Sequence, residues 1–296
     1  MWWYVDAISD DGKHGITIIA FVGSVFSPYY AWANQKAPAD PDNYCCINVA
    51  IYTPGKKRWA MTERKKAAMY RDANHFSVGP SDLSWDGEKL SIRVNERSLP
   101  FAQKISGKIT VYPQGLFNYS VPLDAGKKHR WGPISPVSRV EVNLENPGIK
   151  WSGHAYLDSN EGDEGIHQPF KDWDWARATL KDGSTAVIYD VREKSGQENL
   201  LLLRFTTAGT VETFTEIPRQ MLPLSFWRIQ GQLRSQTPVK LIQSLEDTPF
   251  YTRSMVGANW LGESVHAMHE TLNIPRFSSP IVRWMLPWRM PRLPIL

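Results

Sequence analysis

Two short sequence patterns place an ionisable or hydroxyl group close to an aromatic ring: His129 with Trp131, and Tyr156 with Asp158. In a β-strand, residues two apart lie on one face, so the members of each pair would point the same way. A carboxylic acid in an aromatic-walled cavity is desolvated, which raises its pKa and keeps it able to give up a proton near neutral pH. Aromatic faces would stabilise a resulting cation by roughly 2 kcal/mol when water is excluded. The alternative interpretation is structural, with ordinary barrel residues and Asp158 in a turn.

Other candidate groups form weaker patterns. His266 and His269 are three apart, a spacing that sends them to opposite faces of a strand, so no metal site is expected there. The run Trp173-Asp174-Trp175 and nearby carboxylates would suit a glycoside hydrolase or a sugar-binding sandwich; these acids are Asp158, Glu161, Asp163 and Asp174. No GxGxxG, Walker A, GxSxG or HExxH pattern occurs, which removes support for dinucleotide, nucleotide, nucleophile-elbow and zincin chemistry.

The elements that would position these residues are mostly strands. Apolar residues alternate with polar ones in several runs, including Leu90 to Val94 and Val140 to Leu144. Scattered prolines and glycines favour many short elements, and only Thr62 to Arg71 is typical of a helix. We therefore expect an all-β fold of two domains, with a boundary near Asn146-Pro147-Gly148 that gives residues 1–147 and 148–296.

Composition excludes several classes of protein. With 34 Lys and Arg against 30 Asp and Glu, the net charge is only +4, so no nucleic-acid partner is expected. Cys45 and Cys46 are adjacent and cannot form an unstrained disulfide, which favours a reducing compartment. No apolar run approaches the roughly 20 residues that span a bilayer. The first residues reach Asp6 at once and lack the regions of a signal peptide, so export by that route is not expected.

The C-terminal segment differs from the rest of the chain. From Arg276 onward it contains four arginines, several Trp and Met residues, four prolines and no acidic residue. Tryptophan and arginine together suit the membrane–water interface, where anionic lipids attract cations at about 1 kcal/mol each. The alternative is a tail that packs on its own domain, and the sequence leaves both open.

Several longer runs resemble the bacterial carotenoid 1,2-hydratases, also called hydroxyneurosporene synthases, of purple phototrophs. These runs are Trp2 to Ala7, Ser9 to Gly12, Ile19 to Trp32, Arg58 to Arg64, Ala155 to Asn160, Trp173 to Trp175 and Pro287 to Pro291. They extend over the chain from end to end. Family members usually carry residues before the Trp-Trp-Tyr run, whereas this chain begins within it.

The resemblance implies two lipocalin-like β domains and a hydration that needs no cofactor. Water would add across the terminal C-1,2 double bond of an acyclic carotene such as neurosporene or lycopene, giving a tertiary alcohol. The family's catalytic His-x-Trp and Tyr-x-Asp arrangements fall on residues present here: His129, Trp131, Tyr156 and Asp158.

These implied roles fit the chemistry of the residues. Asp158 would protonate C-2, while Trp131 and Tyr156 would face the cation at C-1. His129 could orient the acid or accept a proton from water, and the sequence leaves this choice open.

A long polyene also needs an apolar passage, and the first candidates to line it are Phe26, Tyr29, Tyr30 and Trp32. Plain core packing is the alternative for these four residues. A lipid-borne substrate favours peripheral attachment to the cytoplasmic side of the inner membrane. A carrier that binds carotenoids or other lipids without altering them is the alternative function, although a container gains nothing from burying ionisable groups.

Overall fold

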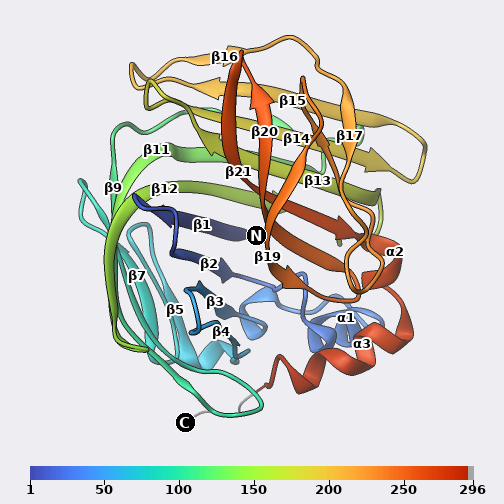
Figure 1. Cartoon of the computed structure of the whole chain (residues 1–296). Helices are drawn as coiled ribbons and strands as arrows, with labels where there is room; N and C mark the ends of the chain where they lie inside the picture. Colours follow the sequence, from blue (N-terminus) through green and yellow to red (C-terminus); the bar gives the residue numbers. More distant parts are fainter. Residues whose placement is uncertain (293–296) are drawn as a thin grey trace. The chain divides into compact units, whose positions relative to one another are not determined.

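The computed structural model describes residues 1–292, and most of them lie in antiparallel strands (Figure 1). They divide into two compact units. Unit 1 contains residues 1–120, 131–161 and the C-terminal segment from residue 284, and unit 2 contains residues 121–130 and 162–283. The predicted all-β class with few short helices is confirmed.

Within residues 1–292, one 12-stranded sheet supplies the strands of unit 1. Its order is β4 (Arg58–Met61), β3 (Cys46–Tyr52), β2 (Gly15–Phe21), β1 (Trp2–Ser9), β12 (Ile149–Gly162), β11 (His129–Asn146), β9 (Lys104–Pro113), β8 (Leu90–Arg97), β7 (Ser81–Trp85), β6 (His75–Val78) and β5 (Met69–Arg71), with β10 (Val121–Pro122) beside β11. The long strands β11 and β12 bend strongly along their length (Figure 1).

Strands β1 and β2 at the centre of this sheet are buried on both faces. One face carries small and branched apolar residues that belong to the core of unit 1: Val5, Ala7, Ile16, Ile18 and Ala20. The opposite face of β1 carries Tyr4 and Asp6, which are also buried. Burial on both faces explains the near-continuous apolar sequence of β2. It also places polar side chains where each needs a partner.

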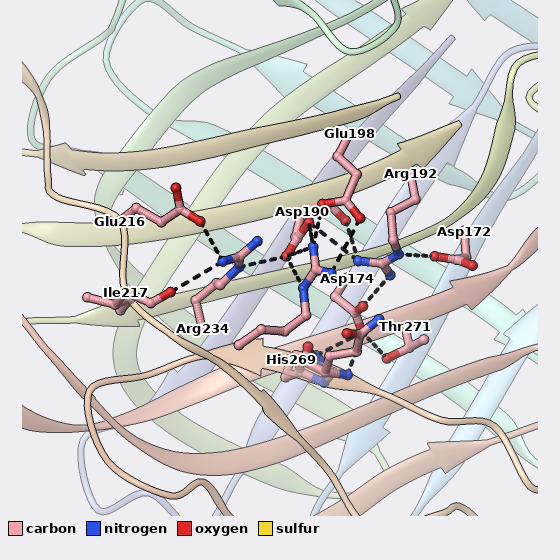
Figure 2. Close-up of polar contacts among 12 residues, drawn as sticks. Asp172, Asp174, Asp190, Arg192, Glu198, Glu216, Ile217, Arg234, His269 and Thr271 are labelled. Carbon is pink, nitrogen blue, oxygen red and sulfur yellow. Dashed lines mark hydrogen bonds and ion pairs between the residues drawn. The ribbon is translucent and has the colours of Figure 1, made fainter. Parts of the chain in front are cut away.

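Unit 2 is built on a second antiparallel sheet. Its order is β16 (Val211–Thr213), β15 (Glu198–Phe205), β14 (Thr185–Glu193), β13 (Phe170–Thr179), β21 (Glu263–Asn273), β20 (Tyr251–Trp260) and β19 (Lys240–Asp247), and β17 (Arg219–Met221) pairs separately with β18 (Gln232–Arg234). An apolar core covers part of one face of this sheet. A buried ion-pair network, drawn in Figure 2, joins residues from β13, β14, β18 and β21.

The helices are short. They are α1 (Pro28–Asn34), α2 (Ile274–Phe277) and α3 (Pro280–Met285), with single 3-10 turns η1 (Pro41–Asn43), η2 (Lys66–Ala68) and η3 (Leu286–Trp288). Helix α1 is capped by Ser27, whose Oγ accepts a hydrogen bond from the backbone N–H of Tyr30 at 2.9 Å. A capping serine followed by proline is a helix start signal that the sequence does contain.

The helix predicted over Thr62 to Arg71 is wrong. This segment contains only the η2 turn, followed by strand β5. Before the turn, the backbone of Arg64 pairs with Cys45, and the Arg64 guanidinium binds Glu96 through both nitrogens at 3.1 and 3.0 Å. These long-range contacts outweigh the modest helix propensity of an Ala, Lys and Met composition.

The division into units also differs from the predicted boundary at residue 147. Pro147 and Gly148 form the turn between β11 and β12, which are neighbours in one sheet, and both strand ends lie in unit 1. A proline–glycine turn closes a hairpin as readily as it ends a domain, so the local sequence does not separate the two cases.

The end of the C-terminal segment packs on unit 1. Arg292 pairs with the fully buried Glu63, donates to the carbonyl of Asn43 at 3.0 Å and lies over the Tyr44 ring at 4.4 Å. Burial raises the pKa of Glu63, and the charge of Arg292 opposes that shift. The end of the described tail therefore packs on residues of the predicted domain 1–147, and not on the predicted domain 148–296 to which the tail was assigned.

We expect Arg292→Met to lower the apparent free energy of unfolding by about 3–5 kcal/mol, because it leaves the buried Glu63 carboxylate without its cationic partner. Urea denaturation measures the change. Lys36→Met, at an exposed position, is the matched control and should change stability little. Equal effects of the two substitutions would contradict a structural role for the Glu63–Arg292 pair.

Candidate active site

Strand β11 places His129 and Trp131 on one face. Both side chains are buried, whereas Arg130 between them is exposed. On β12, Tyr156 is fully buried and Asp158 is 3% exposed. Asp158 lies inside the strand rather than in a turn, so the structural alternative that placed it in a turn is wrong.

Asp158 is the centre of a buried hydrogen-bond cluster. Trp131 donates from Nε1 to Asp158 Oδ2 at 2.7 Å, and the Tyr156 hydroxyl donates to the same oxygen at 2.8 Å. Both distances are those of strong hydrogen bonds. Because Trp131 donates from its ring edge, the indole fixes the carboxyl group in place.

The two carboxyl oxygens of Asp158 therefore differ. Oδ2 accepts two hydrogen bonds, so a proton on this carboxyl group belongs on Oδ1. Asn160 Nδ2 lies 3.3 Å from Oδ1, and the buried Asn160 Oδ1 has no hydrogen-bond partner among the described residues. Turning the amide by 180° would bring this oxygen to Asp158 Oδ1 as an acceptor for the proton. Asn160 is thus a site residue that the sequence analysis did not identify.

Tyr156 acts as a donor in this cluster. Burial raises the pKa of Tyr156 well above its usual value, and the hydrogen bond that Tyr156 donates to Asp158 acts in the same direction. The hydroxyl therefore keeps its proton across the physiological pH range and cannot serve as a base there.

A second Tyr-x-Asp pair, missed in the sequence, lies on the neighbouring strand. Tyr4 donates to Asp6 Oδ2 at 3.1 Å, and Asp6 is fully buried. The antiparallel register sets Tyr4 opposite Asp158 and Asp6 opposite Tyr156. The repeat of the Tyr-x-Asp spacing is a sequence signal that could have identified the pair.

His129 makes its contacts within unit 2. Its Nε2 lies 3.0 Å from the carbonyl oxygen of Glu164 and donates to it, and its Nδ1 lies 3.5 Å from Asp124 Oδ1. The ring packs edge-on against Phe170, with 4.8 Å between centroids. The structure therefore brings Trp131, Tyr156 and Asp158 together, while a catalytic role for His129 stays a prediction.

The four predicted lining residues lie at or before helix α1. Phe26 packs edge-on against Phe21, at 5.7 Å between ring centroids, and Phe21 lies 6.1 Å from Trp2. Since Trp2 pairs with Asn160 in the sheet register, these rings form an aromatic run that begins at the site. Tyr29 and Trp32 contact each other, Tyr30 contacts Tyr44, and Trp32 is 37% exposed. A substrate contact for these residues stays a prediction.

The remaining candidate acids do not form a cluster around Asp158. Glu161 and Asp163 are exposed. Asp174 belongs to the ion-pair network of unit 2, where it binds Arg192 and accepts from Thr271 at 2.6 Å (Figure 2). Burial opposes its ionisation, but hydrogen bonds from His269 and Thr271 and the charge of Arg192 outweigh this and lower the pKa of Asp174. An acid held ionised in this way is unsuited to donate a proton.

The described residues contain no group of three or more His, Cys, Asp or Glu side chains that could hold a metal ion. His266 is exposed and His269 is buried, as expected for opposite faces of β21. None of the helices within residues 1–292 is long and apolar enough to cross a membrane.

Comparison with known proteins adds to this geometry. The chain is 54% identical to the acyclic carotenoid 1,2-hydratase of Rubrivivax gelatinosus and 47% identical to that of Thiocapsa roseopersicina. Each match extends over 296 residues, 99% of this chain and 73% of the relative. The enzyme of the same name from Cereibacter sphaeroides is 36% identical over 280 residues, 94% of this chain and 98% of the relative.

A crystal structure from Nitrosomonas europaea, of a protein named as a candidate AttH, matches with a TM-score of 0.65 and 15% identity. It covers 92% of this chain and 91% of the other, and at this identity it shows the fold alone. The model of the carotenoid hydratase CrtC family matches residues 18–295, nearly the whole chain. The resemblance seen in the sequence is therefore confirmed, and the chain belongs to the carotenoid hydratase CrtC family.

Proposed function

We propose that this enzyme adds water across the C-1,2 double bond of an acyclic carotenoid such as lycopene or neurosporene and gives the 1-hydroxy-1,2-dihydro product. The relatives named acyclic carotenoid 1,2-hydratase support this substrate class. One observation carries the mechanism: the buried Asp158 carboxyl group has two donors on Oδ2, which favours Oδ1, beside Asn160, as the oxygen that carries and delivers a proton.

The reaction begins with the π electrons of the double bond. They take the proton from Asp158 Oδ1 at C-2, and the positive charge develops on the more substituted C-1. A water oxygen then bonds to C-1, and loss of one water proton gives the tertiary alcohol. Protons balance when Asp158 regains one, so the residues require no redox partner, and we propose that no cofactor takes part.

Hydration in heavy water tests the direction of addition. The purified protein, incubated with lycopene in D2O, should give a tertiary alcohol that carries deuterium at C-2. Asp158→Asn should lower the rate by about 10²–10⁴-fold, because the amide cannot supply the proton. Asp163→Asn, the same change at an exposed aspartate, should leave the rate unchanged. Lycopene recovered unaltered but tightly bound by the wild-type protein would instead support a carrier.

Replacing Trp131 separates its two proposed roles, which are to face the cation at C-1 with its ring and to donate a hydrogen bond from Nε1 to Asp158. Trp131→Phe keeps an aromatic ring but removes the Nε1 donor, so we expect a rate about 10- to 100-fold lower, the equivalent of one hydrogen bond to a charged or developing charged group. Product analysis with a thermal melt shows whether the folded variant is slow. A folded variant with wild-type rate would show that the ring, and not the hydrogen bond, is what the reaction needs.

We also propose that the chain attaches peripherally to the cytoplasmic side of the inner membrane, where an apolar polyene resides. Three large apolar side chains near the C-terminus are more than 70% exposed: Ile281, Trp284 and Trp288. Arg283 and Arg289 lie among them, and no acidic residue occurs from Arg276 onward. Exposed tryptophan beside arginine is typical of segments that bind anionic interfaces.

Vesicle sedimentation tests this attachment. The double variant Trp284→Ser, Trp288→Ser should bind vesicles that contain phosphatidylglycerol at least about tenfold more weakly, since each large apolar side chain contributes about 1.5–3 kcal/mol on burial. Phe101→Ser, at a loop residue that is 81% exposed, is the control and should bind normally. Unchanged binding by the double variant would exclude this segment as the anchor.

A further inference from the structure

The proposed hydration needs a group that holds the water and removes its proton. The face of β1 that carries Tyr4 and Asp6, opposite the apolar core, offers such a group. We propose that Asp6 and Thr17 hold the water that adds to C-1, with Asp6 as the base. This inference rests on the proposed function and assigns a second catalytic carboxyl group within it.

Strand register places Asp6 close to the acid. Asp6 is directly opposite Tyr156 and therefore diagonal to Asp158 on the same face. Diagonal neighbours in an antiparallel pair lie roughly 7–8 Å apart, less between their side chains. The Tyr4 and Tyr156 rings meet edge to face with 6.3 Å between centroids, so the two Tyr-x-Asp pairs are in contact. Carboxyl groups about 6.5–9.5 Å apart leave room for one water in inverting glycosidases, which use an acid and a base in the same way.

Thr17 provides an independent observation. It is the register partner of Asp6 in β2, the strand that flanks β1 on the side away from β12, and it is fully buried. Its Oγ1 has no hydrogen-bond partner among the described residues. A buried hydroxyl group left unpaired costs about 1–3 kcal/mol, and a water needs at least two polar partners to be held in such a place. Asp6 and Thr17 are two partners on neighbouring strands of one face.

The division of labour between the carboxyl groups balances the reaction. Asp158 gives its proton to C-2 and becomes a carboxylate, while Asp6 takes a proton from the water as its oxygen bonds to C-1. The cycle closes when Asp6 releases that proton and Asp158 takes one up. Tyr4 donates to Asp6 as Tyr156 donates to Asp158, so one oxygen of each carboxyl group is held by a tyrosine hydroxyl.

His129 is the other candidate base, and its contacts make it less suited. Its Nε2 donates to the Glu164 carbonyl, so only Nδ1 could accept a proton, and that atom lies beside Asp124. Asp6 lies directly opposite Tyr156 in the register of β1 and β12, diagonal to Asp158.

Azide distinguishes a base from a residue that only supports the fold, because azide attacks a cation without needing to lose a proton. Asp6→Ala should lower hydration of lycopene by about 10²–10⁴-fold, and sodium azide should restore lycopene consumption with formation of a 1-azido adduct. Asp158→Asn should form no adduct, because it cannot protonate C-2. Thr17→Val, which keeps the side-chain shape, should hydrate about tenfold more slowly, the equivalent of one hydrogen bond.

Asp6→Asn, which is isosteric, provides a second variant if Asp6→Ala does not fold, and a thermal melt of each variant establishes folding. A wild-type hydration rate in Asp6→Asn would overturn the inference, as would a folded but inactive Asp6→Ala that forms no azide adduct. Neither result would affect the proposed function, which fails only if the wild-type protein does not hydrate the carotenoid.

Discussion

The proposed mechanism depends on one buried carboxyl group, Asp158, whose Oδ2 accepts hydrogen bonds from two donors. Hydrogen bonds to a carboxyl group normally favour its ionised form, whereas burial favours its neutral form. Here the two donors on Oδ2, from Trp131 and Tyr156, are themselves uncharged groups, and Asp158 is almost fully buried. A neutral carboxyl group accepts both bonds through its carbonyl oxygen, and the hydroxyl at Oδ1 then points its proton elsewhere. This asymmetry fixes which oxygen of the buried acid carries the proton.

The sheet makes this arrangement possible by burying β1 and β2 on both faces. One face supplies the apolar core of unit 1, so the strands stay fixed without help from the polar face. The other face can then carry the buried polar residues Asp6 and Thr17. In unit 2, buried acidic groups have charged partners. Its acids, such as Asp174 and Asp190, pair with arginines in an ion-pair network (Figure 2).

Much of the site could be predicted from the sequence, because the relevant signal is local. Period-two spacing places Tyr156 with Asp158, and that prediction needs no knowledge of pairing partners. Asp6 and Thr17 were missed because their proximity to Asp158 depends on register between strands that are more than 130 residues apart in the chain. Periodicity says which face a side chain lies on, but not which strand lies beside it.

Two errors in the fold have the same origin. The segment from Thr62 has a helical composition, yet Arg64 is bound by Glu96, a partner 32 residues away. The Pro147-Gly148 turn looks like a domain boundary, yet it closes a hairpin in one sheet. In both cases contacts between residues distant in the sequence determine the structure, and they outweigh the conformational preference of the local sequence.

Infrared difference spectroscopy of the wild-type protein against Asp158→Asn at neutral pH tests the central claim most directly. The account predicts a carbonyl band of a protonated carboxyl group that shifts in D2O and is absent from the variant. A difference spectrum that contains only carboxylate bands would show that Asp158 is ionised at rest, and it would contradict the account.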